Sequence, residues 1–173
     1  MKMRMVVSGA CCIALCCIPA FGQATTPSSS ADQKFVDLAA QTDMTEAHIG
    51  QMAQDQAAGE AVKDFAQMLV TDHTDDYRKL SDAAAKAGAT VPKAIDAQHN
   101  KMIAPFEKLK GAAFDRHFER EMVAGHEKAI SAYKKAATDL QSADLKAYAT
   151  ATLPALEKHL DAAKGLTKAK AGQ

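Results

Sequence analysis

The sequence predicts an all-α protein, a four-helix bundle with a short extra helix in its central connection. Alanine, lysine, glutamate, aspartate, glutamine and leucine, which favour helix, dominate the chain beyond its first 31 residues. Apolar side chains recur there at spacings of three and four residues in four long segments, the pattern of amphipathic helices. Glycine, proline and serine separate these segments and mark where each helix ends.

The chain begins with a predicted secretory signal peptide, residues 1–22. Lys2 and Arg4 form its basic start, residues 5–18 form an apolar core, and residues 20–22 place small side chains where signal peptidase cleaves. The apolar core is shorter than the roughly 20 residues that a membrane-spanning helix needs. We therefore expect cleavage after Gly22 and export across the inner membrane to the periplasm.

All four cysteines of the chain lie inside this signal peptide: Cys11, Cys12, Cys16 and Cys17. The exported chain then has neither disulfides nor thiolate metal ligands, although it enters an oxidising compartment. Lysine and arginine balance aspartate and glutamate at 21 each, so no basic surface for nucleic acid is expected. No second long apolar run follows the signal peptide, which predicts a soluble periplasmic protein without a membrane span. The sequence identifies no protein partner.

The first predicted hairpin joins two long helices. Residues 23–31 ("QATTPSSSA") are polar and small, which predicts a disordered tether before it. The first helix is expected at about residues 32–57, because apolar residues recur at helical spacing until Gly59 interrupts them. The second is expected at about residues 60–87, with Gly88 as its C-cap.

A shorter helix, at about residues 93–109, is expected between Pro92 and Gly111. Its apolar positions are fewer than those of the long helices. This helix therefore belongs to the connection between the two hairpins rather than to the bundle core.

The second predicted hairpin contains helices at about residues 112–140 and 143–166, with Ser142 as the N-cap of the latter. Pro154 lies inside the last helix and is expected to kink it, because proline cannot donate to the preceding turn. The bundle domain is thus predicted at residues 32–167, followed by a tail, residues 168–173.

Polar residues on the inner stripes mark a candidate site. His126 and His159 have only apolar neighbours three and four positions away, and His73 and Glu46 border the inner stripes of their own helices. Each of the four lies roughly 20–27 Å along its helix from the turn of its hairpin, at about 1.5 Å per residue. A four-helix bundle can bring such residues to one central point.

The stretch "TDHTDD" adds two carboxylates, Asp72 and Asp76. Asp72 is adjacent to His73, so the two side chains diverge by about 100° on a helix and cannot pair with each other. Asp76 lies three residues after His73 and is predicted to orient its ring. We assign Asp72 and Asp76 as carboxylates that orient the ligand imidazoles or as alternative ligands.

A cluster rich in imidazole suits one zinc or copper ion. An oxygen-activating di-iron centre is excluded, because the chain lacks the Glu-x-x-His repeats of such bundles. A buried hydrogen-bonded network without metal is the alternative. Softer copper ligands are offered by Met44, His48 and Met52, which follow one another at four-residue spacing, although such methionine stripes are commonly core.

The chain contains no G-x-S-x-G, H-E-x-x-H or phosphate-binding glycine motif, which favours a non-enzymatic protein with a role in metal handling or envelope stress. Two alternatives stay open. A structural or partner-binding helical module would have a closed polar cluster and an apolar surface groove. A metal-dependent enzyme would have an open coordination position beside a pocket.

Several segments, including "FVDLAAQTDMTEAHIGQMA", "VKDFAQMLVTDHTDDYRKL" and "LPALEKHL", resemble a bacterial family of exported proteins often labelled outer membrane proteins. The resemblance covers about residues 33–166 and implies a ferritin-like helical domain of unknown function. The recurring polar positions of that family correspond to Glu46, Asp72, His73, His126 and His159. Gly125 departs from the family, which commonly has an acidic residue before the histidine.

Overall fold

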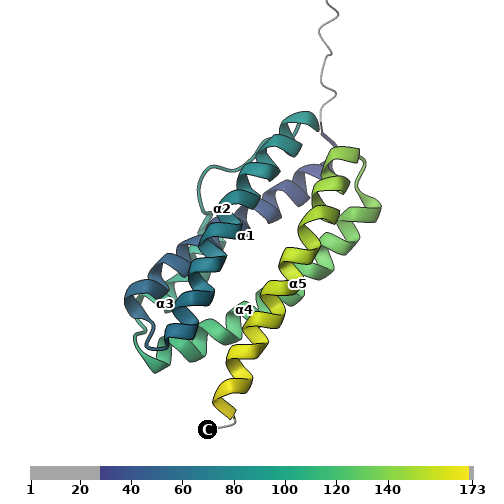
Figure 1. Cartoon of the computed structure of the whole chain (residues 1–173). Coiled ribbons are helices and arrows are strands. Elements are labelled where there is room, and N and C mark those ends of the chain that lie inside the picture. The colour runs from purple at the N-terminus through teal and green to yellow at the C-terminus, as the bar shows by residue number, and fades with distance from the viewer. Residues whose placement is uncertain (1–27, 172–173) are drawn as a thin grey trace, which may run out of the picture.

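The computed structural model describes residues 28–171, and all its regular structure is helical (Figure 1). This confirms the predicted fold class. The helices are α1 (Ser30–Gln56), α2 (Glu60–Lys86), α3 (Ala97–Glu107), α4 (Ala112–Asp139) and α5 (Ala143–Ala171). The predicted signal peptide and most of the predicted tether lie outside the described residues.

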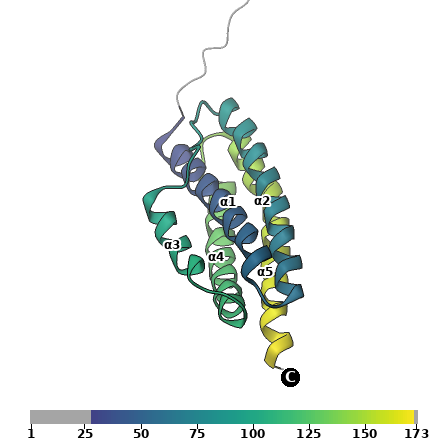
Figure 2. The same ribbon diagram turned by 90° about the vertical axis from the view of Figure 1, so that its left-hand side faces the viewer.

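The four long helices form two antiparallel hairpins, α1 with α2 and α4 with α5. The hairpins meet mainly where α2 packs on α5, whereas α1 and α4 make few contacts with each other. Helix α3 lies on the outside of the bundle, beside α1 and near α4 (Figure 2). The side of the bundle between α1 and α4 is therefore the less tightly closed one.

Helix α1 begins at Ser30, two residues earlier than predicted, because Ser29 caps it. The Ser29 hydroxyl accepts a hydrogen bond from the Asp32 amide at 3.1 Å, which satisfies a free donor of the first turn. The Asp32 carboxylate in turn accepts from the amides of Gln141 and Ser142 at 3.0 and 3.4 Å. The start of α1 is thereby fixed to the link between α4 and α5.

Helix α3 begins at Ala97, four residues later than the sequence predicted. The Gln33 side chain bonds both backbone groups of Thr90, at 2.7 and 2.9 Å, and so holds the preceding segment against α1. Gln41 likewise accepts from the Asp96 amide at 2.9 Å. A helix beginning at residue 93 would need the Asp96 amide for its own bonds, and in the structure Asp96 instead caps α3 by accepting from the His99 amide at 2.8 Å.

The start of α5 agrees with the prediction, whereas its end does not. Ser142 caps α5 as predicted, accepting from the Leu145 amide at 3.3 Å. Helix α5 continues through Pro154 and extends to Ala171, into the segment predicted as a tail. Alanine and lysine dominate residues 168–171, and the helix continues through Gly165 to reach them.

The apolar core is divided into two clusters by a buried polar layer. The tyrosine cluster surrounds Phe35, Leu80, Tyr133, Leu145 and Tyr148. The phenylalanine cluster surrounds Phe65, Leu69, Phe106, Phe114 and Phe118. Each buried large side chain contributes about 1.5–3 kcal/mol to folding, so these clusters can offset the cost of burying charged groups between them.

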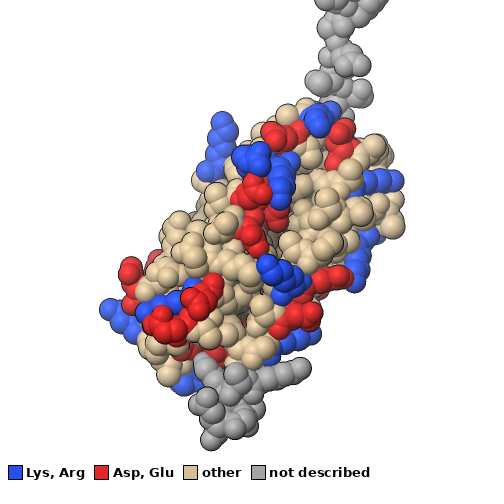
Figure 3. All heavy atoms as spheres, viewed as in Figure 1, with Lys and Arg blue, Asp and Glu red and all other residues tan. Residues whose placement is uncertain are grey.

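The surface carries both signs of charge in close alternation. Figure 3 shows lysine and arginine beside aspartate and glutamate over α2 and α5, and Asp75 bonds both Arg78 and Lys79, at 2.8 and 2.7 Å. Within residues 28–171, no helix combines the length and the apolar character that crossing a membrane requires.

The tight fit between α1 and α2 leads to a prediction about two helical glycines. A Cβ at Gly50 would lie 2.8 Å from Val70 Cγ2 and 2.9 Å from the Ala66 carbonyl oxygen. We expect Gly50→Ala to lower the free energy of unfolding by about 1–3 kcal/mol, because overpacking outweighs the better helix propensity of alanine. Gly165→Ala, where nothing lies within 4 Å, should instead raise it by about 0.5–1 kcal/mol. Urea denaturation measures both, and an equal gain in the two variants would contradict the close approach.

Candidate metal centre

Four side chains, one from each long helix, converge in the polar layer. They are Glu46 of α1, His73 of α2, His126 of α4 and His159 of α5, and all are at least nine-tenths buried. One nitrogen from each imidazole lies within 4.8 Å of the other two. The structure therefore brings together the residues that the sequence placed at one height.

The facing atoms of this cluster are close. His126 Nε2 lies 3.2 Å from His159 Nδ1. Glu46 Oε2 lies 3.1 Å from His73 Nε2 and 3.4 Å from His126 Nε2. Donors bonded tetrahedrally to one ion at about 2.0–2.1 Å are about 3.3 Å apart, so these separations suit a shared cation.

The nitrogen on the far side of each imidazole has a partner that fixes the ring. His73 Nδ1 lies 2.9 Å from Asp43 Oδ1, His126 Nδ1 lies 2.9 Å from the Met122 carbonyl oxygen, and His159 Nε2 lies 2.8 Å from Asp72 Oδ2. A carbonyl oxygen or an ionised carboxylate accepts hydrogen bonds and does not donate, so each outer nitrogen carries the proton. Ligand histidines are commonly oriented in this way.

In the neutral rings, the inward nitrogens are consequently left without hydrogen. His126 Nε2 and His159 Nδ1 then present lone pairs to each other at 3.2 Å. His73 Nε2 and Glu46 Oε2 are buried and lack an aligned hydrogen bond to any described residue, despite their 3.1 Å separation. Such an arrangement requires either an added proton or a cation in the centre.

The charges of this cluster are strongly coupled. Burial alone would raise the pKa of Glu46, but the neighbouring imidazoles of His126 and His73 outweigh it and lower the pKa to about 2. Burial alone would lower the pKa of His73, but Glu46 and Asp43 raise it to about 10. Without a metal ion, His73 is therefore an imidazolium held between two carboxyl groups.

Asp43 is the site residue that sequence reasoning missed. Burial raises its pKa to about 6, against the opposing hydrogen bond with His73. Its position three residues before Glu46 places both carboxyl groups on one face of α1, and that spacing could have indicated it.

The prediction that Asp76 orients His73 is wrong, since Asp43 does so. Asp76 is buried but bonds Lys79 at 3.3 Å, one turn further along its own helix. The His73 ring extends across to α1 rather than along α2, so a residue on another helix reaches its outer nitrogen first.

Asp72 orients an imidazole, but on a different helix from its sequence neighbour. The Asp72 side chain reaches from α2 to His159 on α5. It accepts a hydrogen bond from the outer nitrogen of that ring and does not face the inner nitrogens of the three imidazoles. Burial lowers the pKa of His159, and the hydrogen bond that its ring donates to Asp72 opposes this. Adjacent residues Asp72 and His73 thus support two different imidazoles, as their 100° divergence allows.

The softer methionine arrangement is not assembled into one centre. Met44 packs against the tyrosine cluster, whereas Met52 packs against the phenylalanine cluster. His48, between them on α1, is exposed. The two methionines therefore serve as core side chains on either side of the polar layer.

The pKa values predict how stability depends on pH when metal is absent. The contribution of His73 is complete below pH 6.5 and is lost as the pH rises through about 10. That of Glu46 is complete above pH 4.5 and is lost as the pH falls through about 2. Asp43, with a pKa raised to about 6, has lost its contribution by pH 7. We expect stability with a chelator present to fall between pH 7 and 9.5.

Urea denaturation at several pH values measures this decline, and His73→Gln is the matched variant. Its stability should be nearly flat over the same pH interval, because glutamine does not titrate. A parallel decline in both proteins would show that another group is responsible.

Comparison with solved structures gives the same fold. A "DUF305 fragment from Deinococcus radiodurans" is similar with a TM-score of 0.69 and 15% identity, covering 83% of this chain and 99% of that one. CopM in an Ag-bound form is similar with a TM-score of 0.63 and 17% identity, covering 79% and 95%. CopM in a Cu(II)-bound form gives 0.63 and 16%, covering 78% and 93%.

No curated protein matches the chain significantly. Residues 19–166 match a family described as "Domain of unknown function (DUF4142)", which includes all four converging side chains and nearly all of the bundle. The resemblance to an uncharacterised family of helical domains is thereby confirmed. The chain belongs to the DUF4142 family.

Proposed function

We propose that this protein binds one metal ion, zinc or copper, through His73, His126, His159 and Glu46. The observation that carries the proposal is the convergence of three oriented imidazoles, with one nitrogen of each within 4.8 Å of the other two and with the Glu46 carboxylate beside them. A cation at this point would accept all their lone pairs and would balance the Glu46 carboxylate. It would also remove the free-energy cost of burying polar atoms without hydrogen-bond partners, which is about 1–3 kcal/mol for each such atom.

The donor set selects the kind of ion. Calcium and magnesium take oxygen ligands almost exclusively, so three imidazoles argue against them. Zinc and copper accept imidazole together with a carboxylate. Asp43 and Asp72 bond the outer nitrogens of His73 and His159, and among the described residues Glu46 is the carboxylate that faces the inner nitrogens, so a carboxylate-rich two-iron site does not fit.

The structural relatives favour copper as the first ion to test. Two similar structures are of CopM, one Ag-bound and one Cu(II)-bound. Their identity of 16–17% supports a shared fold rather than a shared site. The proposal for this chain therefore rests on its own imidazoles, and the similar structures decide only that copper is tested before zinc.

We further propose that the protein works in the periplasm, in metal handling or in the response to envelope stress. The predicted signal peptide supports export. The central ligands are at most 6% exposed, which suits holding or passing on an ion better than turning over a substrate.

A purely structural network is the second candidate. The observation that favours it is the position of the His73 imidazolium between Asp43 and Glu46. These two carboxyl groups can balance its charge without any metal. This arrangement leaves the facing nitrogens of His126 and His159 in need of one further proton. The protein would then act as a helical module that binds a partner.

Metal content decides between the two candidates. The untagged protein purified from the periplasm is expected to carry about one zinc or copper ion per chain by elemental mass spectrometry. Its intact mass should correspond to a chain beginning at Gln23. Metal-free protein that also fails to bind either ion on titration would leave the structural network as the function of this cluster. A soluble form that retains residues 1–22 would contradict export by signal cleavage.

A further inference from the structure

The proposed centre is buried so deeply that an ion needs a defined route to it. His73, His126 and His159 are each at most 1% exposed. Tight packing of α1 on α2 and of α4 on α5 closes two sides of the bundle. Access is therefore expected where the helices are less closely packed.

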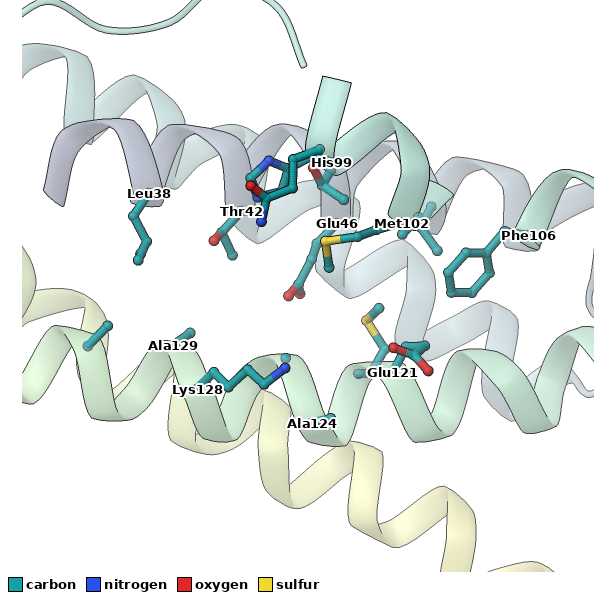
Figure 4. A pocket seen from close by; sticks show the side chains of 16 residues that line it. Leu38, Thr42, Glu46, His99, Met102, Phe106, Glu121, Ala124, Lys128 and Ala129 are labelled. Atoms are coloured by element: carbon teal, nitrogen blue, oxygen red, sulfur yellow. The ribbon is translucent and has the colours of Figure 1, made fainter. Parts of the chain in front are cut away.

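A cavity opens on the side between α1, α3 and α4. Its volume is about 340 Å³, and its lining includes Glu46, Ile49, Met122 and Gly125 (Figure 4). Glu46 is the single proposed ligand that lines it, and its carboxylate points into this space from α1. A Cβ at position 125 would lie 3.3 Å from Glu46 Oε1, so the absence of a side chain there keeps the way to the carboxylate open.

The rim of this cavity carries large hydrophobic side chains that are exposed to solvent. Among the described residues, the large hydrophobic side chains that are exposed are Leu38, at 42%, and Met102, at 50%, and both line this cavity. Met102 reaches over it from α3. His99 lies three residues earlier on the same face of α3, with Nδ1 bonded to Asp96 at 2.8 Å. A thioether and an oriented imidazole thus stand together at the opening.

We infer that this cavity is the entrance through which the ion reaches the centre, and that Met102 and His99 capture soft monovalent copper or silver at its rim. Thioether sulfur binds copper(I) and silver(I) well but binds zinc poorly. The ion then passes along Met122 to the Glu46 carboxylate and on to the imidazoles by exchange of ligands, with no change of oxidation state. This inference rests on the proposed metal centre and adds its route and its preferred form of ion.

A second cavity provides an internal comparison. It lies between α2 and α5, has a volume of about 460 Å³, and is lined by Asp76, Lys79, Lys86, Tyr148 and Ala151. None of the four proposed ligands lines it. Its lining carries carboxylates and lysines but neither sulfur nor imidazole, so it offers no soft ligand to copper(I).

The test is the rate of metal uptake by the exported form of the chain. Copper(I) is supplied as its coloured bicinchoninate complex under anaerobic conditions, and zinc as the complex of a chromophoric indicator. Loss of colour on rapid mixing gives the rate, and equilibrium titration with the same complexes gives the affinity. Ala124→Phe fills the cavity of Figure 4 from α4, and Ala151→Phe is the matched insertion in the second cavity.

Ala124→Phe is expected to slow the uptake of both ions at least tenfold without changing the equilibrium affinity, whereas Ala151→Phe should behave as wild type. Met102→Leu should slow copper(I) uptake several-fold and leave zinc uptake unchanged. Leu38→Trp also blocks the rim of the cavity, and it replaces Ala124→Phe in the test if that variant does not fold. Because Leu38 is exposed, the larger side chain should not disturb folding.

The outcomes separate this route from the centre itself. Wild-type protein that binds neither ion at equilibrium would overturn the proposed centre. Intact equilibrium binding with unchanged uptake in Ala124→Phe and Leu38→Trp, or with slowing in Ala151→Phe instead, would overturn the route alone. Equal slowing of copper(I) and zinc by Met102→Leu would overturn the capture of soft ions at the rim.

Discussion

Zinc or copper at 100 times its dissociation constant is expected to raise the melting temperature by about 5–10 °C. Binding to the folded state alone at that excess adds about 2.7 kcal/mol to stability. One kcal/mol corresponds to about 2–4 °C for a domain of this size. The increase should grow with metal concentration and disappear when a chelator is added, and differential scanning calorimetry measures it directly.

His126→Ala and His159→Ala are each expected to abolish the rise, because each removes an inner nitrogen. His117→Ala is the control, since His117 lies near the surface and bonds Arg120 rather than the cluster. The rise, rather than the starting melting temperature, is compared, so a general loss of stability does not affect the result. A full rise in the His126→Ala variant would exclude this site.

The rise should also weaken in acid. Ligand imidazoles must be unprotonated, and His73 carries a proton up to a pH of about 10 before the metal binds. Binding therefore releases a proton, and the affinity should increase steadily between pH 6 and 8. A rise in melting temperature that is independent of pH would indicate ligands other than these imidazoles.

Glu46→Gln is expected to reduce the free energy of unfolding of the metal-free protein by about 3 kcal/mol at pH 7. The glutamine keeps the shape of the side chain but leaves the buried imidazolium of His73 without its inner counter-charge, which costs about 3–5 kcal/mol in comparable pairs. Urea denaturation in the presence of a chelator measures the loss. The control is Glu121→Gln. Glu121 is a partly exposed carboxylate that lines the cavity of Figure 4 together with Glu46, and its replacement should change the free energy of unfolding by less than about 0.5 kcal/mol.

A double-mutant cycle assigns the loss to this pair. When His73 is already glutamine, the further change Glu46→Gln should cost clearly less than it does alone, because no buried positive charge is left unpaired. Equal costs in the two backgrounds would mean that Glu46 acts independently of His73, and the ion pair would then contribute nothing measurable.

The sequence by itself determined the helices and their order. Apolar periodicity identified α1, α2, α4 and α5, and Gly59, Gly88 and Ser142 marked three of their ends, because local backbone preferences act within a few residues. It also placed Glu46, His73, His126 and His159 at one height. Helical rise converts a count of residues into a distance, so this part of the site needed no knowledge of contacts.

Only the tertiary structure decided which residue supports which imidazole. Asp76 is the nearest carboxylate to His73 in sequence, yet Asp43 of α1 holds it, and Asp72 crosses to His159 on α5. The start of α3 combines both influences, because Asp96 caps it locally by accepting from the His99 amide, while Gln41 on α1 accepts from the Asp96 amide. Such partners depend on how far and at what angle two helices approach, and side-chain spacing along one helix carries no information about that distance.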